Sequence, residues 1–431
     1  MNILIIGSGG REHAIADTYA KSGRTTNIYV APGNDLMEEK NSKIHTLSNL
    51  NYQNHEKLLA VIRNKKIDLV DVAGDEPLAS GLVDFLSSYG IPSFGPTKNA
   101  AELEWNKSWS RSFMQKYKLP IPKVDKFSDE KSVLEYLKGK KDALLFVKAS
   151  GLAGGKGVIR TENSKDVLVA IKKIKGLGIS GKEFLIEEGL SGEEFSFFAL
   201  SDGRDYKILG NAQDHKTVYE NGQGPNTGGM GCASPVSILN KTLEAKIKRT
   251  IFDPLFFGMT KEKRPYSGIL YLGGMLTKKG VKIIEFNARL GDPEAEVILP
   301  SLKTDYTKIV EAVHAQKITA LSIASDNKTR VSITACARGY PEDYGKVMEK
   351  EIFGLEKLLE IPEVLVFGAG IKRQGKKYLV NGGRILHVVG AGKNIFEARE
   401  KAYQAMSNLY IQGNNLHYRT DIGYKEIEKN L

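Results

Sequence analysis

The sequence predicts a multidomain α/β and α+β protein, and three features of the chain support this fold class. Strand and helix patterns alternate through residues 1–97, which is typical of a parallel sheet covered by helices. The central region pairs strand-like runs with glycine-rich loops, and residues 330–431 hold further strand-like runs beside one amphipathic helix. At 431 residues the chain is long enough for about two to four domains.

The composition is that of a soluble globular protein, with 41% hydrophobic and 26% charged residues. No apolar run approaches the roughly 20 residues that span a bilayer, and the opening MNILIIGSGG lacks the basic start and cleavage site of a signal peptide. Cys232 and Cys336 lie far apart without CxxC spacing, which predicts reduced thiols and no zinc site. We therefore expect a cytoplasmic protein with no membrane partner.

The formal net charge of +11 raises the question of an anionic partner. The lysines are scattered along the whole chain, and no aromatic and basic module of the kind that stacks bases is present. This distribution argues against a nucleic-acid partner and fits small anionic substrates.

In the first region, strands are expected at 2–7, 27–34 and 67–77, and helices at 11–23, 55–66 and 77–90. Ligands of parallel sheets collect at the carboxyl ends of the strands. The loops at those ends are Gly7–Gly10, Pro32–Asn34, Gly74–Pro77 and Gly95–Thr97.

The first of these loops resembles a dinucleotide fingerprint but does not match it. The fingerprint needs glycine at its sixth position, and this chain has Glu12 there. An acid at the start of the helix would also repel the negative charge of a pyrophosphate. A mononucleotide or sugar phosphate bound by the backbone amides, or a tight turn without a ligand, both fit the loop.

Residues 99–117 are predicted to form a helix that contains Lys107 and ends before LPIP, the expected domain boundary. A buried-type strand then ends near Lys148 and leads into GLAGGKGV. This loop is not a Walker A motif, because Gly157 stands where Ser or Thr would bind magnesium. The glycines around Lys156 suit a flap that brings amides and an ammonium group onto phosphates, although a flexible hairpin turn also fits.

Two strands joined by EEGLSGE are expected within residues 183–202, and a carboxylate in this linker could bind the hydroxyls of a ribose. The segment 214–235 follows, with five glycines and little regular secondary-structure signal. An irregular stretch of this length is usually functional or disordered. Its PNTGGMG run offers consecutive amides for an anion.

A hairpin then leads into VKIIEFNARLGDPE, where Glu285 and Asn287 are two residues apart at a strand end. Period-2 geometry puts both side chains on one face, so together they can hold a hard divalent cation such as magnesium. Arg289 and Asp292 follow in a loop. A strand end closed by a salt-bridged turn is the alternative interpretation.

The last region, 330–431, combines strands with a helix over 394–410 that has one apolar side. Arg384 closes an NGGR turn, where it would contact a phosphate or simply flank a hairpin turn.

Eight segments in this order resemble phosphoribosylamine–glycine ligase (glycinamide ribonucleotide synthetase), a family of the ATP-grasp superfamily, from residue 1 to about residue 425. They are GSGGREHA, APGN, FGPT, VKASGLAGGKGV, IEEGLSGEEFS, QDHKTVYENGQGPNTGGMG, EFNARLGDPE and NGGRILHVVG. The resemblance implies an N-terminal Rossmann-like domain (1–98), an ATP-grasp domain (99–328) whose mobile ATP lid lies within 122–190, and a small β-rich C-terminal domain (329–431).

The activity implied by the resemblance joins glycine to 5-phosphoribosylamine in de novo purine biosynthesis. ATP would be consumed with Mg²⁺ or Mn²⁺, and glycinamide ribonucleotide, ADP and phosphate would form through glycyl phosphate. A monomer with small-molecule partners is expected. The alternatives are a purine-pathway ATP-grasp enzyme that activates formate or bicarbonate, and a nucleotide-binding regulatory protein without turnover.

The resemblance also implies a role for each matching residue. ATP would be bound by Lys107, Lys148, Lys156, Gly154, Gly155, Glu187, Glu188, Leu190 and Glu194. The metal would be held by Glu285 and Asn287, and the catalytic groups would be Arg289, Asp292 and Asp214. The other substrates would be bound by Gly9, Gly10, Asn34, Asp75, Pro225, Asn226, Thr227, Gly228, Gly229, Gly383 and Arg384.

The chain departs from the family pattern at two places that concern phosphoribosylamine. The family commonly has Gly-Pro-Glu at 73–75, where this chain has Ala73, Gly74 and Asp75. Either Asp75 or Glu76 would therefore take the place of the family glutamate. Asp35 and Leu36 follow Asn34, where the family prefers small residues.

Overall fold

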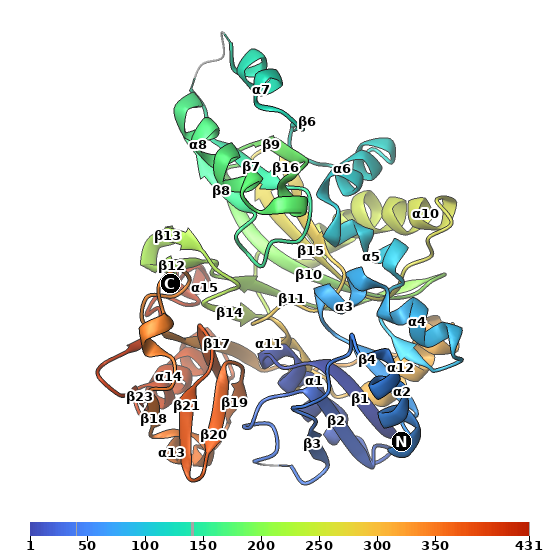
Figure 1. The fold of residues 1–431 in the computed structure, drawn as a ribbon, viewed down its shortest axis with the longest axis vertical. Helices are drawn as coiled ribbons and strands as arrows, with labels where there is room; N and C mark the ends of the chain where they lie inside the picture. The colour runs from blue at the N-terminus through green and yellow to red at the C-terminus, as the bar shows by residue number, and fades with distance from the viewer. Residues whose placement is uncertain (40, 139–141, 431) are drawn as a thin grey trace.

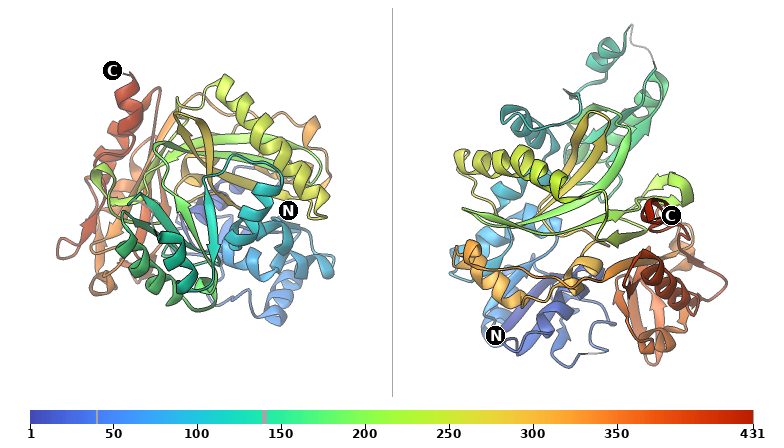
Figure 2. Two further views of the ribbon diagram at one scale, coloured as in Figure 1. Left: turned by 90° about the horizontal axis from the view of Figure 1, so that it is seen from above. Right: turned by 180° about the vertical axis from the view of Figure 1, so that it is seen from behind.

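The computed structural model describes residues 1–39, 41–138 and 142–430, and it confirms the predicted fold class. Figure 1 shows the N-terminal and C-terminal regions side by side at the base, with the central region above them. Seen from behind, the uppermost part of the central region stands apart from the base (Figure 2). The chain thereby places three regions around a common centre.

The N-terminal region is a parallel sheet covered by helices, as predicted. Its strands in sheet order are β3 (Ile44–Thr46), β2 (Asn27–Pro32), β1 (Asn2–Gly7), β4 (Leu69–Val72) and β5 (Ser93–Phe94). Its helices are α1 (Gly10–Ala20), α2 (His55–Asn64), α3 (Asp75–Ser80) and α4 (Leu82–Ser88). The central strand β1 is apolar on both faces because neighbouring strands flank it and helices cover it.

Two predicted helices are each divided in the structure. The helix expected at 77–90 breaks at Gly81, whose φ of +89° lies in the left-handed region. The helix expected at 99–117 becomes α5 (Lys98–Trp105) and α6 (Lys107–Lys116). Asn106 separates them, and its side chain caps α6 by accepting a hydrogen bond from the Trp109 amide at 3.0 Å. This break puts Lys107 at the first residue of α6.

Asp71 on β4 gives the first testable prediction, because it is buried and accepts a hydrogen bond from the Tyr19 hydroxyl at 2.9 Å. Burial raises the pKa of Asp71 from 3.8 to about 7. The folded state therefore favours the protonated acid. The protonated Asp71 contributes its full stabilisation of the folded state below pH 3.8, and this contribution is lost as the pH rises through about 7. From about pH 5 to about pH 8, the free energy of unfolding should fall by about 2 kcal/mol more in the wild type than in Asp71→Asn.

Urea denaturation of both proteins at the two pH values measures that difference. The asparagine keeps an acceptor for Tyr19 but does not ionise, so parallel pH dependences for the two proteins would contradict the prediction.

The upper part of the central region is an antiparallel sheet with its own apolar core (Figure 1). The strands in sheet order are β6 (Val124–Phe127), β9 (Phe184–Glu188), β7 (Leu145–Ala149) and β8 (Val158–Thr161). The helices α7 (Glu130–Leu137) and α8 (Ser164–Lys175) pack on it. The lid predicted within 122–190 encloses this sheet, and its mobility stays a prediction. Residues 139–141 of that range lie outside the described residues.

A larger sheet runs from the central region into the C-terminal region. Its main path, in sheet order, is β16 (Gly280–Asn287), β15 (Ser267–Thr277), β10 (Gly192–Asp202), β11 (Tyr206–Asp214), β14 (Gly231–Ser234), β17 (Thr329–Ala337), β22 (Arg384–Gly392) and β19 (Val364–Gly368). The predicted hairpin before Glu285 is confirmed as β15 and β16. Because β14 pairs with β17, hydrogen bonds cross the boundary predicted between residues 328 and 329, and the domain limits stay predictions.

The segment 214–235 is more regular than we expected. After β11, a short hairpin of β12 (Thr217–Tyr219) and β13 (Gln223–Asn226) precedes β14. Asn221 and Gly222 turn it with φ of +57° and +74°. The sequence expectation was wrong because turns at positive φ and short ladders carry little apolar periodicity.

The remaining elements complete the core around the larger sheet. The helices of this part are α9 (Lys241–Ile247), α10 (Asp253–Lys261), α11 (Ala295–Ile298), α12 (Tyr306–His314), α13 (Leu355–Glu360), α14 (Ile395–Met406) and α15 (Tyr424–Asn430). A small sheet contains β20 (Ile371–Gln374), β21 (Lys377–Val380), β18 (Glu351–Phe353) and β23 (Tyr410–Ile411), and β24 (Leu416–His417) pairs with β17. The apolar side predicted for α14 is buried, which confirms its amphipathic pattern.

Two expectations from composition concern the cysteines and the membrane. Cys232 and Cys336 are free and buried. Over the described ranges, the structure contains no helix with the length and apolar character needed to cross a bilayer.

Candidate active site

A cavity of about 570 Å³ collects most of the predicted site residues. It lies between the β6–β9–β7–β8 sheet and the β16 end of the larger sheet, and α15 of the C-terminal region contributes to its wall. The predicted residues that line it are Asp75, Lys107, Lys148, Gly154, Gly155, Glu187, Glu188, Leu190, Glu194, Asp214, Asn226, Thr227, Gly228, Glu285, Asn287, Arg289 and Asp292.

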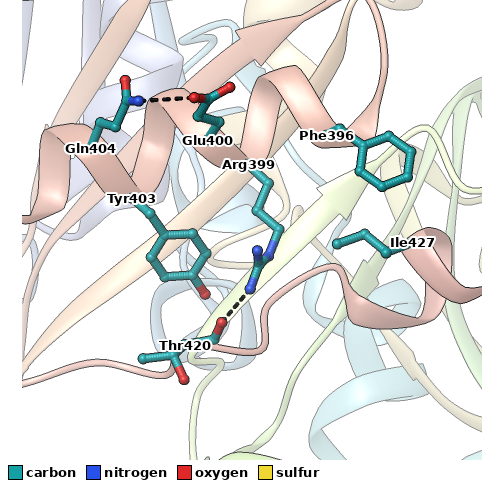
Figure 3. Close-up of a pocket in the computed structure, with 7 residues that line it drawn as sticks. All are labelled: Phe396, Arg399, Glu400, Tyr403, Gln404, Thr420 and Ile427. Carbon is teal, nitrogen blue, oxygen red and sulfur yellow. Dashed lines mark hydrogen bonds between the residues drawn. The ribbon is translucent and has the colours of Figure 1, made fainter.

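A second, shallow pocket lies on the outside of the C-terminal region (Figure 3). It is formed by α14 and the chain around Thr420, where Arg399 donates a hydrogen bond to the Thr420 carbonyl oxygen. None of the predicted site residues lines it. The larger cavity is therefore the candidate active site.

One end of the cavity is a buried cluster of two cations around Glu187. Lys148 Nζ lies 2.7 Å from Glu187 Oε2, and Arg111 Nε lies 2.6 Å from Glu187 Oε1. Burial by itself would raise the pKa of Glu187, but Lys148 and Arg111 hold it below its ordinary value. Lys107 lies nearby, and burial lowers the pKa of its amine.

Removal of the Glu187 charge should destabilise the protein. Glu187→Gln leaves Lys148 and Arg111 buried with one negative charge fewer, and we expect a loss of about 3 kcal/mol in the free energy of unfolding. Urea denaturation measures this loss. Glu162→Gln is the matched control, because Glu162 pairs with Arg160 at 2.9 Å on the surface and its removal should cost less than about 1 kcal/mol. Equal effects of the two substitutions would refute the prediction.

Glu285 and Asn287 both line the cavity from the end of β16. Arg111 fixes this strand by donating a hydrogen bond to the Ile284 carbonyl oxygen at 2.5 Å. Lys216 Nζ lies 3.2 Å from Glu285 Oε1. Burial opposes ionisation of Glu285, but Lys216, Lys148 and Lys107 lower its pKa to about 2. An ionised carboxylate beside an amide oxygen fits the ligand preference of Mg²⁺.

Arg289 is held in place by Glu104 of α5. Arg289 NH2 lies 2.7 Å from Glu104 Oε1, and the Ala288 amide donates to Glu104 Oε2 at 2.8 Å. Burial opposes a charge on Asp75, but Arg289 and Arg11 lower the pKa of this acid below its ordinary value. Asp75 lines the cavity and Glu76 is exposed, so Asp75 is the acid of this pair that lies at the site.

The opposite end of the cavity contains Asp214 and Asp292. Burial, followed by the nearby charge of Glu294, raises the pKa of Asp214 well above its ordinary value. Arg384 reaches this end from the C-terminal region: its NH1 donates to the Asp292 carbonyl oxygen at 2.7 Å and to the Gly228 carbonyl oxygen at 2.8 Å. Acidic groups and an arginine from distant parts of the chain therefore meet there.

The first loop approaches the same end. The Gly9 amide donates to Glu12 Oε2 at 2.7 Å, so the acid that breaks the dinucleotide fingerprint occupies the start of α1 itself. A Cβ atom at Gly9 would lie 3.2 Å from Asp292 Oδ2. Asn34 instead joins two regions, because its Nδ2 donates to the carbonyl oxygens of Ser8 at 2.8 Å and Gly368 at 2.7 Å.

Some predicted residues lie outside the wall of the cavity. Lys156 is exposed on the turn between β7 and β8, beside Gly154 and Gly155, whose φ values are +52° and +80°. The other predicted residues outside the wall are Gly9, Gly10, Asn34, Pro225, Gly229, Gly383 and Arg384. Of these, Arg384 makes an ion pair with Asp292 at 3.0 Å, and a Cβ atom at Gly229 would lie 3.1 Å from the Asp292 carbonyl oxygen.

Several charged residues of the site were not predicted from the sequence, namely Glu104, Arg111, Lys216 and Glu294. Lys216 could have been found, because it stands two residues after Asp214 in the irregular segment. Glu104 and Arg111 lie in ordinary helical patterns, so no local signal marks them. Glu294 is the last residue of the VKIIEFNARLGDPE run but was given no role, and its Oε1 accepts a hydrogen bond from Ser196 at 2.9 Å.

Lys148 on β7 and Lys107 at the start of α6 line the same cavity as the carboxylate of Glu285 and the amide of Asn287 at the end of β16, and this fold and site define an ATP-grasp protein. Three family profiles match in succession: the phosphoribosylglycinamide synthetase N domain (residues 1–104), ATP-grasp (A) domain (105–295) and C domain (330–425). The chain belongs to the phosphoribosylglycinamide synthetase family.

Relatives with known names agree with this membership. A phosphoribosylamine–glycine ligase from Caldanaerobacter subterraneus subsp. tengcongensis is 38% identical, with 98% of this chain and 99% of that protein covered. A trifunctional purine biosynthetic protein adenosine-3 from Gallus gallus is 39% identical over 99% of this chain, which spans 42% of that longer protein. The crystal structure of phosphoribosylamine–glycine ligase from Thermotoga maritima has a TM-score of 0.82 at 32% identity, covering 98% of this chain and 100% of that chain.

Proposed function

We propose that this chain is an ADP-forming ligase that joins glycine to 5-phosphoribosylamine with ATP, giving glycinamide ribonucleotide, ADP and phosphate in de novo purine biosynthesis. One observation carries the proposal. A single cavity has a lysine-rich end, where Lys107 and Lys148 lie, and an acidic end that Arg384 and the first loop approach. The first end suits a nucleoside triphosphate, and the second suits an amine and a sugar phosphate.

The chemistry follows from the poor reactivity of a carboxylate, whose leaving group would be oxide. A glycine carboxylate oxygen attacks the γ-phosphorus, the bond to the bridging oxygen breaks, and ADP leaves. The amine of phosphoribosylamine then attacks the acyl carbon of glycyl phosphate, phosphate leaves, and the amine loses a proton. In the first step the protein mainly positions the groups and balances charge. Lys107, Lys148 and Arg289 supply the positive charge.

Glu285 and Asn287 would hold Mg²⁺ or Mn²⁺, since Glu285 is ionised and Asn287 offers an amide oxygen on the same strand. When bound, the ion neutralises phosphate charge and orients the nucleotide. Lys216 now pairs with Glu285 at 3.2 Å, and it would share that carboxylate with the ion.

At the acidic end, Asp214 and Asp292 would contact the amines of the two acceptors. The N-terminus of α1 at Gly9 and Gly10, together with Arg384, would bind the phosphoribosyl group. Asp75 takes the place of the family glutamate. The acyl phosphate must be shielded from water, and the sheet within 122–190 would close as a lid over it.

The protein works as a cytoplasmic monomer whose partners are ATP, glycine and phosphoribosylamine. Its three regions correspond to domains at 1–98, 99–328 and 329–431.

Release of ADP should require both acceptors. The enzyme is incubated with ATP and magnesium, and glycine and phosphoribosylamine, made in situ from ribose 5-phosphate and ammonia, are added separately and together. We expect ADP release only when both are present, with formate and bicarbonate inert. Turnover with formate or bicarbonate in place of glycine would overturn the glycine assignment, and a lack of turnover with every acceptor would favour a regulatory protein.

A further inference from the structure

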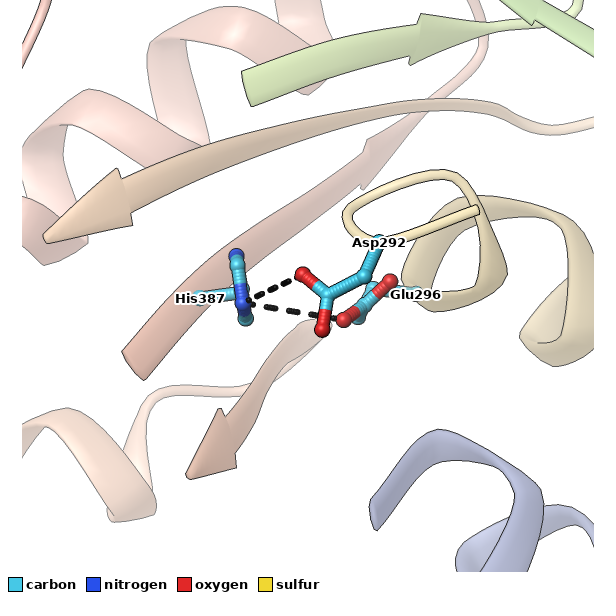
Figure 4. A group of neighbouring side chains, drawn as sticks. All are labelled: Asp292, Glu296 and His387. Atoms are coloured by element: carbon cyan, nitrogen blue, oxygen red, sulfur yellow. Dashed lines mark ion pairs between the residues drawn. The ribbon is translucent and has the colours of Figure 1, made fainter. Parts of the chain in front are cut away.

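The acidic end of the cavity has one wall of buried side chains and another that follows an exposed hairpin. Asp292 belongs to the first wall, where His387 and Glu296 lie beside it and are completely buried (Figure 4). Thr227 and Gly228 directly follow the β12–β13 hairpin and line the same cavity. The position of the hairpin therefore shapes this end of the cavity.

The hairpin has little support of its own. Within the described residues, β12 and β13 pair only with each other, and every residue of β13 is exposed. On β12, Val218 is buried. An isolated two-stranded hairpin is marginally stable at best in water. Contacts with other parts of the chain must therefore fix its position.

Residues 417–423 of the C-terminal region supply such contacts. Figure 1 and Figure 2 show β12 and β13 beside α15, which follows this segment. The amide and the hydroxyl of Thr420 donate to Glu220 Oε1 at 3.2 and 3.1 Å. His417 Nε2 lies 2.9 Å from the Val218 carbonyl oxygen. The segment therefore contacts both the first strand and the turn of the hairpin.

Arg419 joins the 417–423 segment to the hairpin and forms a buried ion pair. Its Nη1 donates to the Thr217 carbonyl oxygen at 3.0 Å and to Thr217 Oγ1 at 2.9 Å. Its Nε and Nη2 donate to the two carboxyl oxygens of Asp421 at 2.7 and 2.6 Å. Asp421 Oδ2 also accepts from the Asn221 amide at 3.0 Å. These four contacts occupy most of the five N–H groups of a guanidinium, so Arg419 supports the cavity wall and is not free to bind a substrate.

The 417–423 segment is itself held by α14 of the C-terminal region. Arg399 Nε donates to the Ile422 carbonyl oxygen at 3.1 Å. The Tyr403 hydroxyl donates to the Arg419 carbonyl oxygen at 2.8 Å and accepts from the Ile422 amide at 3.1 Å. The segment therefore connects the hairpin to the packed core of the C-terminal region.

The hairpin in turn holds two side chains that line the cavity. Lys216 directly precedes Thr217, and its Nζ lies 3.2 Å from Glu285 Oε1. The Lys216 carbonyl oxygen accepts from both the amide and the hydroxyl of Thr227 at 2.8 Å. Thr227 Oγ1 accepts from the Gly229 amide at 3.0 Å. A displacement of β12 would therefore move the cation beside Glu285 and the loop at Thr227 together.

Glycine is the substrate that these groups would affect first. In the proposed reaction its carboxylate attacks the γ-phosphorus, so it must lie beside the ion that Glu285 would hold. The phosphoribosyl group is assigned to the α1 N-terminus and Arg384, and ATP is assigned to the lysine-rich end. A displaced hairpin should therefore weaken the binding of glycine more than that of ATP.

We propose that Arg419 is a positioning residue for glycine: together with Asp421 it fixes the β12–β13 hairpin, and through Thr217 it keeps Lys216 and Thr227 in place. The substrate named here rests on the proposed function. The contacts between Arg419 and the hairpin do not.

Steady-state kinetics with three variants test the proposal. Arg419→Gln removes the planar set of donors and should raise the KM for glycine about 10-fold, while the KM for ATP changes less than about twofold. Arg419→Lys keeps a charge for Asp421 and a donor for Thr217, so it should raise the KM for glycine only about threefold. Thr217→Val removes a single acceptor and should also raise this KM about threefold.

Arg330→Gln is the matched control. Arg330 on β17 makes an ion pair of the same form with Asp326, at 2.8 and 2.6 Å, and Arg330 does not line the cavity. These two side chains are 7% and 23% exposed, against 2% and 17% in the pair of Arg419 and Asp421. Loss of the control pair should cost a comparable amount of stability but leave the KM for glycine within about twofold of the wild type.

Amide hydrogen exchange, followed by mass spectrometry, examines the hairpin without turnover. The Asn221 amide donates to Asp421 and the Thr227 amide donates to the Lys216 carbonyl oxygen, so both report on the contacts in question. Without substrates, peptides over residues 217–227 should exchange about 10-fold faster in Arg419→Gln than in the wild type. In Arg330→Gln they should exchange at the wild-type rate.

Four results would overturn the proposal. They are an unchanged KM for glycine in both Arg419→Gln and Thr217→Val, equal rises in the KM values for glycine and ATP, an equal rise for glycine in Arg330→Gln, and unchanged exchange of the hairpin in Arg419→Gln. If Arg419→Gln does not fold, Arg419→Lys and Thr217→Val decide the matter by the same criteria. A wild type without turnover would instead refute the proposed function, and hydrogen exchange would still test whether Arg419 holds the hairpin.

Discussion

Glu285→Gln should reduce the rate of ADP formation by at least about 1,000-fold with little change in the fold. The substitution keeps the size of the side chain and removes the charge that faces Lys216, Lys148 and Lys107. It also removes the anionic ligand that we assign to the divalent cation. Because the pKa of Glu285 is about 2, the carboxylate is ionised from about pH 5 to about pH 9, and no pH in this range should restore the variant.

The measurement is kcat for ADP release with all substrates, supported by circular dichroism and a thermal melt. Glu363→Gln is the matched control, since Glu363 also has a pKa lowered to about 2 by two lysines, Lys328 and Lys401, but lies on the surface of the C-terminal region. The control should retain wild-type activity. A Glu285→Gln enzyme with near-normal turnover would remove the metal role of this residue.

Arg289→Lys should lower kcat about 100-fold even though the positive charge is kept. The guanidinium of Arg289 makes an ion pair with Glu104 at 2.7 Å and donates to the Leu290 carbonyl oxygen at 3.1 Å, which fixes its plane beside the cavity. A lysine ammonium lacks the planar set of donors of a guanidinium, so it cannot make these contacts and face a phosphoryl group at the same time. The charge would then lie in several positions and would stabilise the transferring phosphoryl group poorly.

Arg264→Lys provides a control whose partner is on the same helix, because Arg264 pairs with Glu102 of α5 as Arg289 pairs with Glu104. Arg264 does not line the cavity. We expect this control to change kcat less than about twofold. Similar kcat values for the two variants would mean that Arg289 acts through the stability of α5 and not on the phosphoryl group.

The type and order of the helices and strands could largely be predicted from the sequence, because strand and helix periodicity is a local property. The N-terminal alternation, the hairpin before Glu285 and the apolar side of α14 are all present as predicted. The elements that were misjudged depend on single residues. Gly81 and Asn106 each end a helix, and positive φ angles at Asn221 and Gly222 build a hairpin where the sequence shows no strand pattern.

The sequence by itself determined the order of the secondary structure, the family, and the short motifs whose members are neighbours in the chain, such as Glu285 with Asn287. Only the tertiary structure decided which distant charges meet: Glu104 with Arg289, Arg111 with Glu187, and His387 with Asp292. The physical reason is that a buried ion pair depends on two backbones that arrive at the same place. Each partner alone sits in an ordinary helix, strand or loop, so its own neighbourhood in the sequence carries no mark of the contact.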